Sequence, residues 1–235
     1  MNTSWGRVAT IVISLIVIGA FGFFWYQQSQ LAPEPEPEQP TLADWVDRGI
    51  KPEDLERQQQ KIADVQQQIA DLQAAGDEDI SLYLRLGNLY YGIGELKLAA
   101  DQYLYILSGH PTDAPALENL AQVQVERGDY AGAEASWRAA LLTEPYEPTY
   151  LKLADLITEH FPDRQAEVQP LLEDAIATLG QSVGLLTHLG DWYADNGMYD
   201  EAISHYEVAL QLDPDNEGLK NDLDDLRALR TKETK

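Results

Sequence analysis

The chain contains no cysteine, and only 16 Lys and Arg residues stand against 40 Asp and Glu residues. The absence of cysteine excludes disulfides, thiolate metal ligands, a cysteine nucleophile and lipid attachment to an N-terminal cysteine. The formal net charge of -24 opposes binding to nucleic-acid phosphates, so no nucleic-acid partner is predicted. Such a surface favours solubility and basic or neutral protein partners.

Residue patterns that carry chemistry are also scarce. The four histidines lack metal-ligand spacing, and neither a phosphate-binding glycine loop nor a nucleophile elbow is present. Carboxylate pairs are unavoidable among 40 acidic residues, so they are no evidence for acid–base catalysis. We predict that the chain is not an enzyme and has no catalytic, cofactor-binding or metal site.

One uncharged apolar run stands near the N-terminus, from Val8 to Phe24, and Trp25 and Tyr26 extend it. As a helix, residues 8–26 span about 28 Å, close to the hydrocarbon thickness of a bilayer. Aromatic residues at both ends favour the membrane interfaces. The run therefore predicts a single transmembrane helix that acts as a signal anchor.

The positive charges near this run predict its orientation. Arg7 and the amino terminus precede it, whereas the next positive residue is Arg48. Residues 1–7 are therefore expected in the cytoplasm and the rest of the chain outside it, in the periplasm or at the cell exterior. A cleaved signal peptide is the alternative, but its apolar stretch is usually shorter and ends at a small-residue cleavage site.

Residues 27–51 form a Pro/Glu-rich spacer, with the sequence APEPEPEQP at 32–40. Alternating prolines favour polyproline II, and the glutamates between them repel one another. We expect a stiff strut that holds the folded part away from the membrane.

Residues 52–79 predict a leading helix that starts at Pro52 and stops at Gly76. Its apolar stripe allows two interpretations. It could form a short coiled coil that joins two copies into a homodimer, or it could pack as a half-repeat against the next segment of the chain. The stripe consists of Leu55, Ile62, Val65, Ile69 and Leu72.

From residue 80 the sequence repeats itself with a period of 34, as between Pro111 and Pro145. Each unit has apolar residues at helical spacing, a small residue for close helix contact, a turn glycine and a final proline. Residues at equal offsets include Leu86-Gly87, Gly94, Ala99, Tyr103 and Pro111; Leu120-Ala121, Gly128, Ala133, Trp137 and Pro145; and Leu189-Gly190, Gly197, Ala202, Tyr206 and Pro214.

These units closely resemble the tetratricopeptide repeat (TPR), a 34-residue helix–turn–helix motif. The resemblance implies an all-α fold, a solenoid of helix pairs. It divides the chain into TPR 1 (80–113), TPR 2 (114–147), a degenerate TPR 3 (148–182), TPR 4 (183–216) and a capping helix with tail (217–235).

The degenerate unit carries an extra residue, which we place in the turn His160–Asp163, and Pro170 is expected to shorten or kink its second helix. The capping helix should bury Leu219, Leu223, Leu226 and Leu229.

By resemblance, the first helices of the units line a concave protein-binding groove. The inward positions are Leu84, Asn88, Tyr91, Glu118, Asn119, Gln122, Val125, Lys152, Leu156, Glu159, Thr187, Asp191 and Asp195. This mixture of apolar, amide and acidic groups suits a peptide with apolar and basic residues.

One TPR subclass grips C-terminal carboxylates of chaperones with a Lys/Arg/Asn clamp. Asn88 and Asn119 stand at two clamp positions, but Leu84, Thr149 and Leu153 replace its cations, so no such clamp is expected. In plan the chain is similar to TPR subunits of cytochrome c biogenesis and of secretion. That likeness implies a scaffold or chaperone-like adaptor in the assembly of envelope or secreted proteins, and self-association through the leading helix is the alternative.

Overall fold

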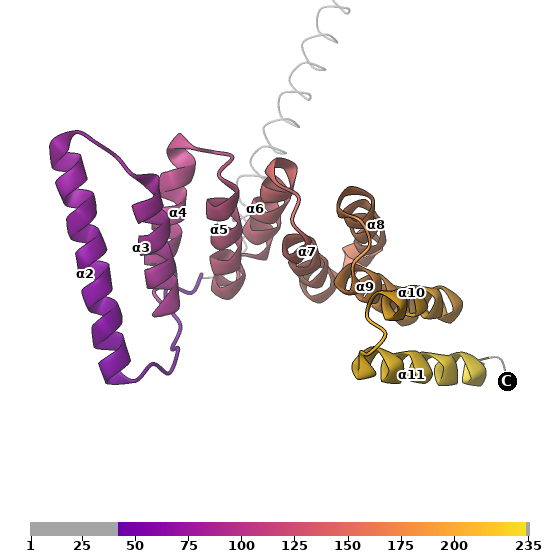
Figure 1. Ribbon diagram of the computed structural model, residues 1–235. Helices are drawn as coiled ribbons and strands as arrows, with labels where there is room; N and C mark the ends of the chain where they lie inside the picture. The colour runs from indigo at the N-terminus through magenta and orange to yellow at the C-terminus, as the bar shows by residue number, and fades with distance from the viewer. Residues whose placement is uncertain (1–41, 234–235) are drawn as a thin grey trace, which may run out of the picture. The chain divides into compact units, whose positions relative to one another are not determined.

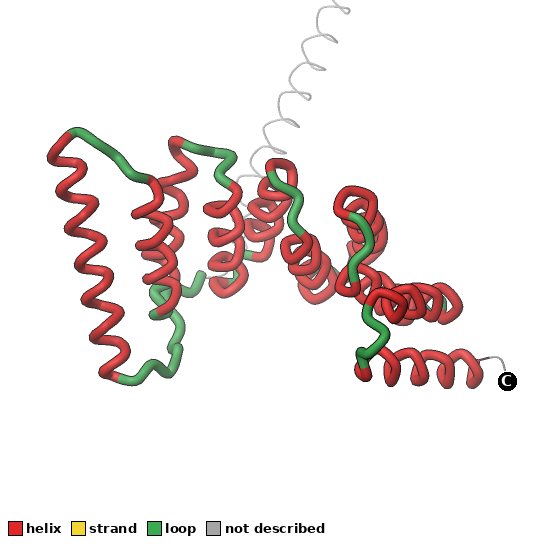
Figure 2. The backbone as a smooth tube through the Cα atoms, in the orientation of Figure 1, coloured by secondary structure: helices red, strands yellow, loops and turns green. Residues whose placement is uncertain are grey.

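A computed structural model describes residues 42–233, which form α-helices joined by short loops and one 3-10 helix, with no strand in that range (Figures 1 and 2). The all-α prediction is confirmed for these residues. The helices are α2 (Pro52–Ala75), α3 (Ile80–Gly92), α4 (Leu96–Gly109), α5 (Ala114–Arg127), α6 (Tyr130–Thr143), α7 (Glu147–His160), α8 (Val168–Leu179), α9 (Val183–Asp195), α10 (Tyr199–Leu212) and α11 (Glu217–Glu233), and the 3-10 helix is η1 (Pro162–Glu167).

The expected membrane helix at 8–26 lies outside the described residues, as do 1–7 and most of the spacer. Within 42–233, none of the helices combines the length and apolar character that crossing a bilayer requires.

The leading helix α2 packs against α3 of the same chain. Pro52 occupies its first turn, and Gly76 ends it with a φ of 79°. Three residues of its stripe, Ile62, Val65 and Ile69, are buried in one cluster with residues of α3 and α4. The centre of the stripe is therefore occupied within the chain, as the half-repeat interpretation requires.

Close contact between a small residue and an aromatic ring joins the helices of a repeat. A Cβ atom added to Gly87 of α3 would lie 2.5 Å from the ring of Tyr103 on α4. A Cβ added to Gly190 of α9 would lie 2.7 Å from the ring of Tyr206 on α10. Only glycine permits this approach, so these two pairs fix how tightly each helix pair packs.

The third unit departs from the others after its first helix. η1 follows α7, and Pro170 lies in the first turn of α8, where its missing N–H leaves no helical hydrogen bond unmade. Ion pairs tie η1 to α6: Arg164 of η1 contacts Glu134 of α6 at 2.6 Å, and Arg138 of α6 contacts Glu167 of η1 at 3.0 Å. These guanidinium groups, Arg164 first, lower the pKa of Glu134 to about 2.

The last helix, α11, covers α10. Leu219, Leu223 and Leu226 are buried in a cluster with residues of α9 and α10, whereas Leu229 remains 43% exposed. Three of the four expected leucines thus close the C-terminal end of the repeats.

Replacing Ile62 by Ala tests the packing of α2. The change removes buried methyl groups from the core, so the free energy of unfolding should fall by about 2–4 kcal/mol. Urea unfolding of the full-length chain in detergent measures the loss, and the exposed Gln59→Ala on the same helix is the control.

Sedimentation of the same samples should show equal mass for the two variants and the parent chain. A drop in mass with unchanged stability would instead support the coiled-coil interpretation of the stripe.

Candidate functional site

The first helices of the repeats, α3, α5, α7 and α9, form a row joined by polar side chains. Asn119 Nδ2 of α5 donates to Asn88 Oδ1 of α3 at 3.1 Å. Thr149 Oγ1 of α7 donates to Glu118 Oε1 of α5 at 2.7 Å. The expected groove residues Asn88, Asn119 and Glu118 are therefore engaged along the row, which leaves them fewer free groups for a partner.

Two further expected residues are also engaged within the chain. Leu84 packs against the core cluster of α2 to α5. The Thr187 hydroxyl donates to the carbonyl oxygens of Val183 and Gly184 in its own helix, at 2.9 Å and 3.0 Å.

The segment 42–51, which we call the strap, lies along the turns of repeats 1 and 2. Val46 N donates to the Gly94 carbonyl at 2.9 Å, and Lys97 N donates to the Asp44 carbonyl at 2.9 Å. Ala43 N donates to the Arg127 carbonyl at 3.1 Å, and Arg127 Nε returns a bond to the Ala43 carbonyl at 3.0 Å. The last part of the expected spacer is therefore packed on the repeats and is not a free strut.

The strap also covers Tyr91. The guanidinium carbon of Arg48 lies 4.7 Å from the centre of the Tyr91 ring, and Arg48 Nη2 pairs with Glu126 at 2.6 Å. The Tyr91 hydroxyl donates to the same Glu126 carboxylate. Because its ring and hydroxyl are both engaged, Tyr91 belongs to an internal contact between the strap, α3 and α5.

The remaining expected residues line two adjoining cavities, which we call the α5–α9 groove. The first cavity, of about 230 Å³, lies between α5 and α7; the second, of about 240 Å³, lies between α7 and α9. Asp155 lines both. The first is lined by Gln122, Val125, Trp137, Lys152, Asp155, Leu156, Glu159 and His160, and the second by Ala154, Asp155, Thr158, Gln165, Val168, Leu172, His188, Asp191, Trp192, Asp195 and Asn196.

Sequence reasoning missed Asp155. The pairs Leu120-Ala121 and Leu189-Gly190 have their counterpart in Leu153-Ala154, whose side chains are buried. By that alignment, Asp155 corresponds to Gln122 and Asp191, while Leu156 is only 3% exposed. The small residue Ala154 was the available signal, and the extra length of the unit lies in η1, after α7.

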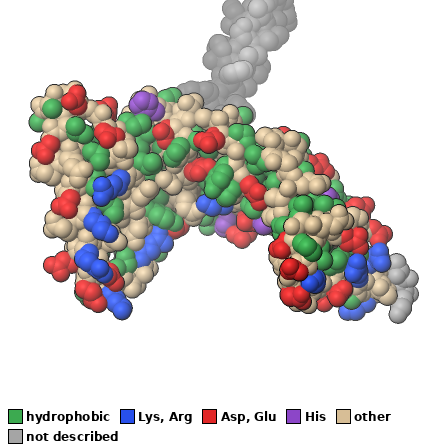
Figure 3. Space-filling view, in the orientation of Figure 1, with side chains coloured by type: hydrophobic (Ala, Val, Ile, Leu, Met, Phe, Trp, Pro, Cys, Tyr) green, Lys and Arg blue, Asp and Glu red, His purple; other side chains and the backbone are tan. Residues whose placement is uncertain are grey.

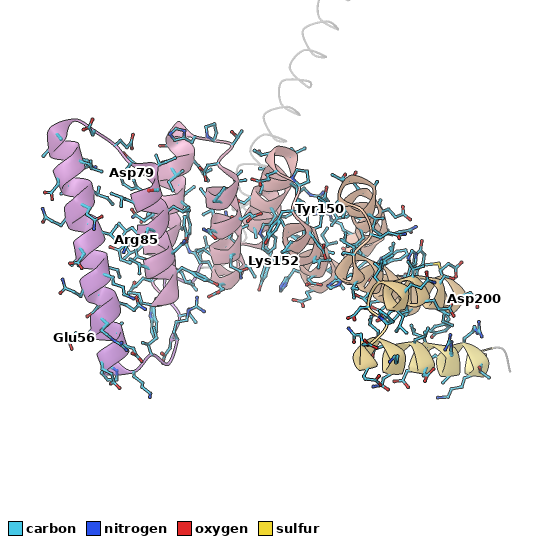
Figure 4. All side chains as sticks on the ribbon, viewed as in Figure 1. Glu56, Asp79, Arg85, Tyr150, Lys152 and Asp200 are labelled. Carbon is cyan, nitrogen blue, oxygen red and sulfur yellow. The ribbon has the colours of Figure 1, made fainter. Side chains whose placement is uncertain are left out.

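The groove carries excess negative charge. Asp155, Glu159, Asp191 and Asp195 line it, with Lys152 as its one Lys or Arg residue (Figure 4). Partial burial raises the pKa of Asp155, His188 lowers it, and the Glu159 and Asp191 carboxylates raise it further. On the face drawn in Figure 3, Lys and Arg side chains gather over the α2 end and near α11, whereas acidic side chains are spread throughout.

His188 and Trp192 complete the wall beside these carboxylates. His188 Nε2 lies 3.6 Å from Asp155 Oδ1, and Nδ1 lies 3.0 Å from the Gly184 carbonyl oxygen. Trp192 Nε1 donates to the Gln165 carbonyl at 3.0 Å, which fixes the indole ring against η1. The groove therefore offers an aromatic wall next to uncompensated carboxylates, an arrangement that can accommodate the stem and the charged head of a basic side chain.

Comparison with known proteins identifies one repeat and the fold. A family model described as tetratricopeptide repeat matches residues 183–216. No curated protein matches the sequence. Solved structures show the same fold: the chain is similar to MamA, with a TM-score of 0.56 and 20% identity, over 71% of this chain and 95% of that chain.

Two other solved structures support the same fold. YrrB, described as a TPR protein with an unusual peptide-binding site, has a TM-score of 0.54 and 21% identity over 71% of this chain and 84% of that chain. A tetratricopeptide repeat protein from Parabacteroides merdae has a TM-score of 0.55 and 20% identity over 77% of this chain and 75% of that chain. The described residues thus form a TPR solenoid, and at these identities the likeness shows the fold alone.

Gly94→Ala tests the strap. Gly94 has a φ of +87°, and an added Cβ would lie 2.0 Å from the Val46 carbonyl oxygen. The strap should detach, so the Val46 and Lys97 amides should exchange with solvent deuterium faster.

Gly128→Ala is the matched control, because Gly128 has a φ of +83° but no atom within 4 Å of the added Cβ. Both variants should lose about 1–2 kcal/mol through backbone strain. Equal protection of Val46 and Lys97 in both would show that the strap does not depend on Gly94.

Proposed function

We propose that this chain is a membrane-anchored scaffold or adaptor that binds peptide segments of other proteins in the α5–α9 groove. The observation that carries the proposal is the pair of adjoining cavities that share Asp155, lined by four carboxylates and one lysine. Proteins built from TPR units are protein-interaction scaffolds, and the peptide-binding site of YrrB is a precedent on the same fold. The segment bound is extended or helical and combines apolar residues with Lys or Arg.

Apolar and acidic groups have separate roles in this proposal. Val125 and Trp192 supply the apolar contact that gives affinity. Asp155, Asp191 and Asp195 supply a negative potential that attracts a basic segment and rejects an acidic one. A solenoid of this kind assembles proteins without altering them, which agrees with the expectation that the chain is not an enzyme.

The membrane anchor is the second part of the proposal. Its support is the uncharged run at 8–26, with Arg7 before it and the first following positive charge at Arg48. The N-terminus then lies in the cytoplasm and the repeats lie outside it, where the groove meets envelope or secreted proteins during their assembly.

The blocked peptide Ala-Leu-Lys-Leu-Lys-Ala, with Ala-Leu-Glu-Leu-Glu-Ala as its acidic counterpart, tests the groove. The full-length chain should bind the lysine peptide in preference, and added salt should weaken the binding because it screens the charges. The double variant Asp155→Asn with Asp191→Asn should bind it about tenfold more weakly by calorimetry.

The control removes two charges elsewhere, by Glu53→Gln with Glu56→Gln on the exposed face of α2 (Glu56 is labelled in Figure 4). Equal loss in both double variants would mean that net charge, and not the groove, attracts the peptide. Equal affinity for the two peptides would refute a groove selective for basic segments.

The anchor is tested by protease added to spheroplasts. If the repeats lie outside the cytoplasmic membrane, the protease should degrade residues 41–235 and spare a short anchor fragment. Digestion that occurs only after lysis would place the repeats in the cytoplasm.

A further inference from the structure

Three second helices carry an aromatic residue at the same place in the repeat: Tyr103 on α4, Trp137 on α6 and Tyr206 on α10. All three are buried, with exposures of 1%, 3% and 5%. Each belongs to a repeat whose first helix has a small residue at the contact, namely Gly87, Ala121 or Gly190. Each aromatic residue lies 16 positions after that small residue, so the repeats can be compared with one another.

In two of these repeats the polar atom is satisfied within the chain. The Tyr103 hydroxyl donates to Asn88 Oδ1 at 2.7 Å, across a sequence separation of 15. The Tyr206 hydroxyl donates to Asp191 Oδ1 at 2.6 Å, again across a separation of 15. The acceptor is each time the residue after the small residue of the first helix, on the groove side of the row.

Repeat 2 lacks this bond. The residue at the same separation from Trp137 is Gln122, yet Trp137 Nε1 has no hydrogen-bond partner among the described residues. A buried donor left without an acceptor destabilises the fold, and most such groups in native proteins are paired. Trp137 and Gln122 line the same cavity of the groove, so an acceptor that reaches Nε1 from this cavity would remove the cost.

We propose that Trp137 Nε1–H is a recognition group that donates a hydrogen bond to a backbone carbonyl of the bound peptide. The inference rests on the proposed function and adds a defined contact point to it. An extended segment presents backbone carbonyl acceptors whatever its sequence. An acidic side chain as the acceptor would instead be repelled by Glu159 and Asp155, which line the same cavity. The bound segment thus places its backbone at Trp137 and a basic side chain toward Asp155, which the second cavity shares.

Tryptophan-selective nitrogen-15 labelling of the full-length chain tests the contact directly. The chain has five tryptophans, so five indole N–H signals are expected, and Trp137→Phe identifies one of them. Addition of the blocked peptide Ala-Leu-Lys-Leu-Lys-Ala should move the Trp137 indole proton downfield, because it gains a hydrogen bond. The peptide with glutamate in place of lysine should leave it unmoved.

Trp137→Phe also tests the contact by affinity, because the substitution removes the indole N–H and keeps an aromatic ring. It should bind the lysine peptide about three- to tenfold more weakly. The loss of an unpaired buried donor should offset the loss of ring volume, so unfolding in urea should change little. Tyr103→Phe is the control: its hydroxyl is already bonded to Asn88, so stability should fall and affinity should stay the same.

The outcomes separate the two levels of the proposal. One outcome would overturn the recognition role of Trp137 and still support the groove as the binding site. In that outcome the double variant Asp155→Asn with Asp191→Asn loses binding, the Trp137 signal does not move, and Trp137→Phe binds as the parent chain does. No binding of the lysine peptide at millimolar concentration overturns both. A Trp137 indole proton that already has the downfield shift of a hydrogen-bonded indole without peptide would show an internal acceptor, and that also overturns the role.

Discussion

The contact between a small residue on the first helix and a large aromatic or apolar residue on the second sets the geometry on which this structure depends. Where the small residue is Gly87 or Gly190, the tyrosine ring lies so close that a Cβ would overlap it. This contact fixes the rotation of the first helix, and therefore the direction of the next residue along it. Those next residues are Asn88, Gln122, Asp155 and Asp191, and the last three line the α5–α9 groove. One packing constraint thus positions both the core and the polar surface beside it.

The sequence predicts the parts that depend on this repeated constraint, since a small residue, an aromatic residue and a turn glycine recur at fixed spacing. It also predicts the start of α2 at Pro52 and its end before Gly76, because both residues act locally on the backbone. It does not predict the strap, whose bonds join main-chain groups such as Val46 N and the Gly94 carbonyl and leave no side-chain pattern. Asp155 was missed for a different reason: Ala121 and Ala154 are 33 residues apart, so counting forward in units of 34 places each inward position of α7 one residue too late.

The strap forms ion pairs at the first half of the row. The chain has only 16 Lys and Arg residues, and two of them form ion pairs that hold the strap. Arg48 pairs with Glu126, and Arg127 lies 3.4 Å from Asp44. Repeats 1 and 2 are thereby neutralised at their turns, and Tyr91 is covered.

Arg138 and Arg164 are likewise paired with Glu134 and Glu167, beside η1. The carboxylates around Asp155 share their two cavities with Lys152 as the one lining Lys or Arg residue, so a basic partner would gain most there.

The covered ends of the stack also favour the side of the row as the surface for a partner. A solenoid exposes apolar faces at its first and last repeats unless further elements cover them. Here α2 buries Ile62, Val65 and Ile69 against the first pair, and α11 buries Leu219, Leu223 and Leu226 against the last. Association of copies end to end would have to displace one of these helices, at the cost of several buried apolar side chains. Contacts along the side of the row require no such loss, because Val125, Lys152 and Trp192 already line open cavities. A partner that bound across the repeats would therefore cause the least rearrangement, and along α5, α7 and α9 it would meet the acidic groove.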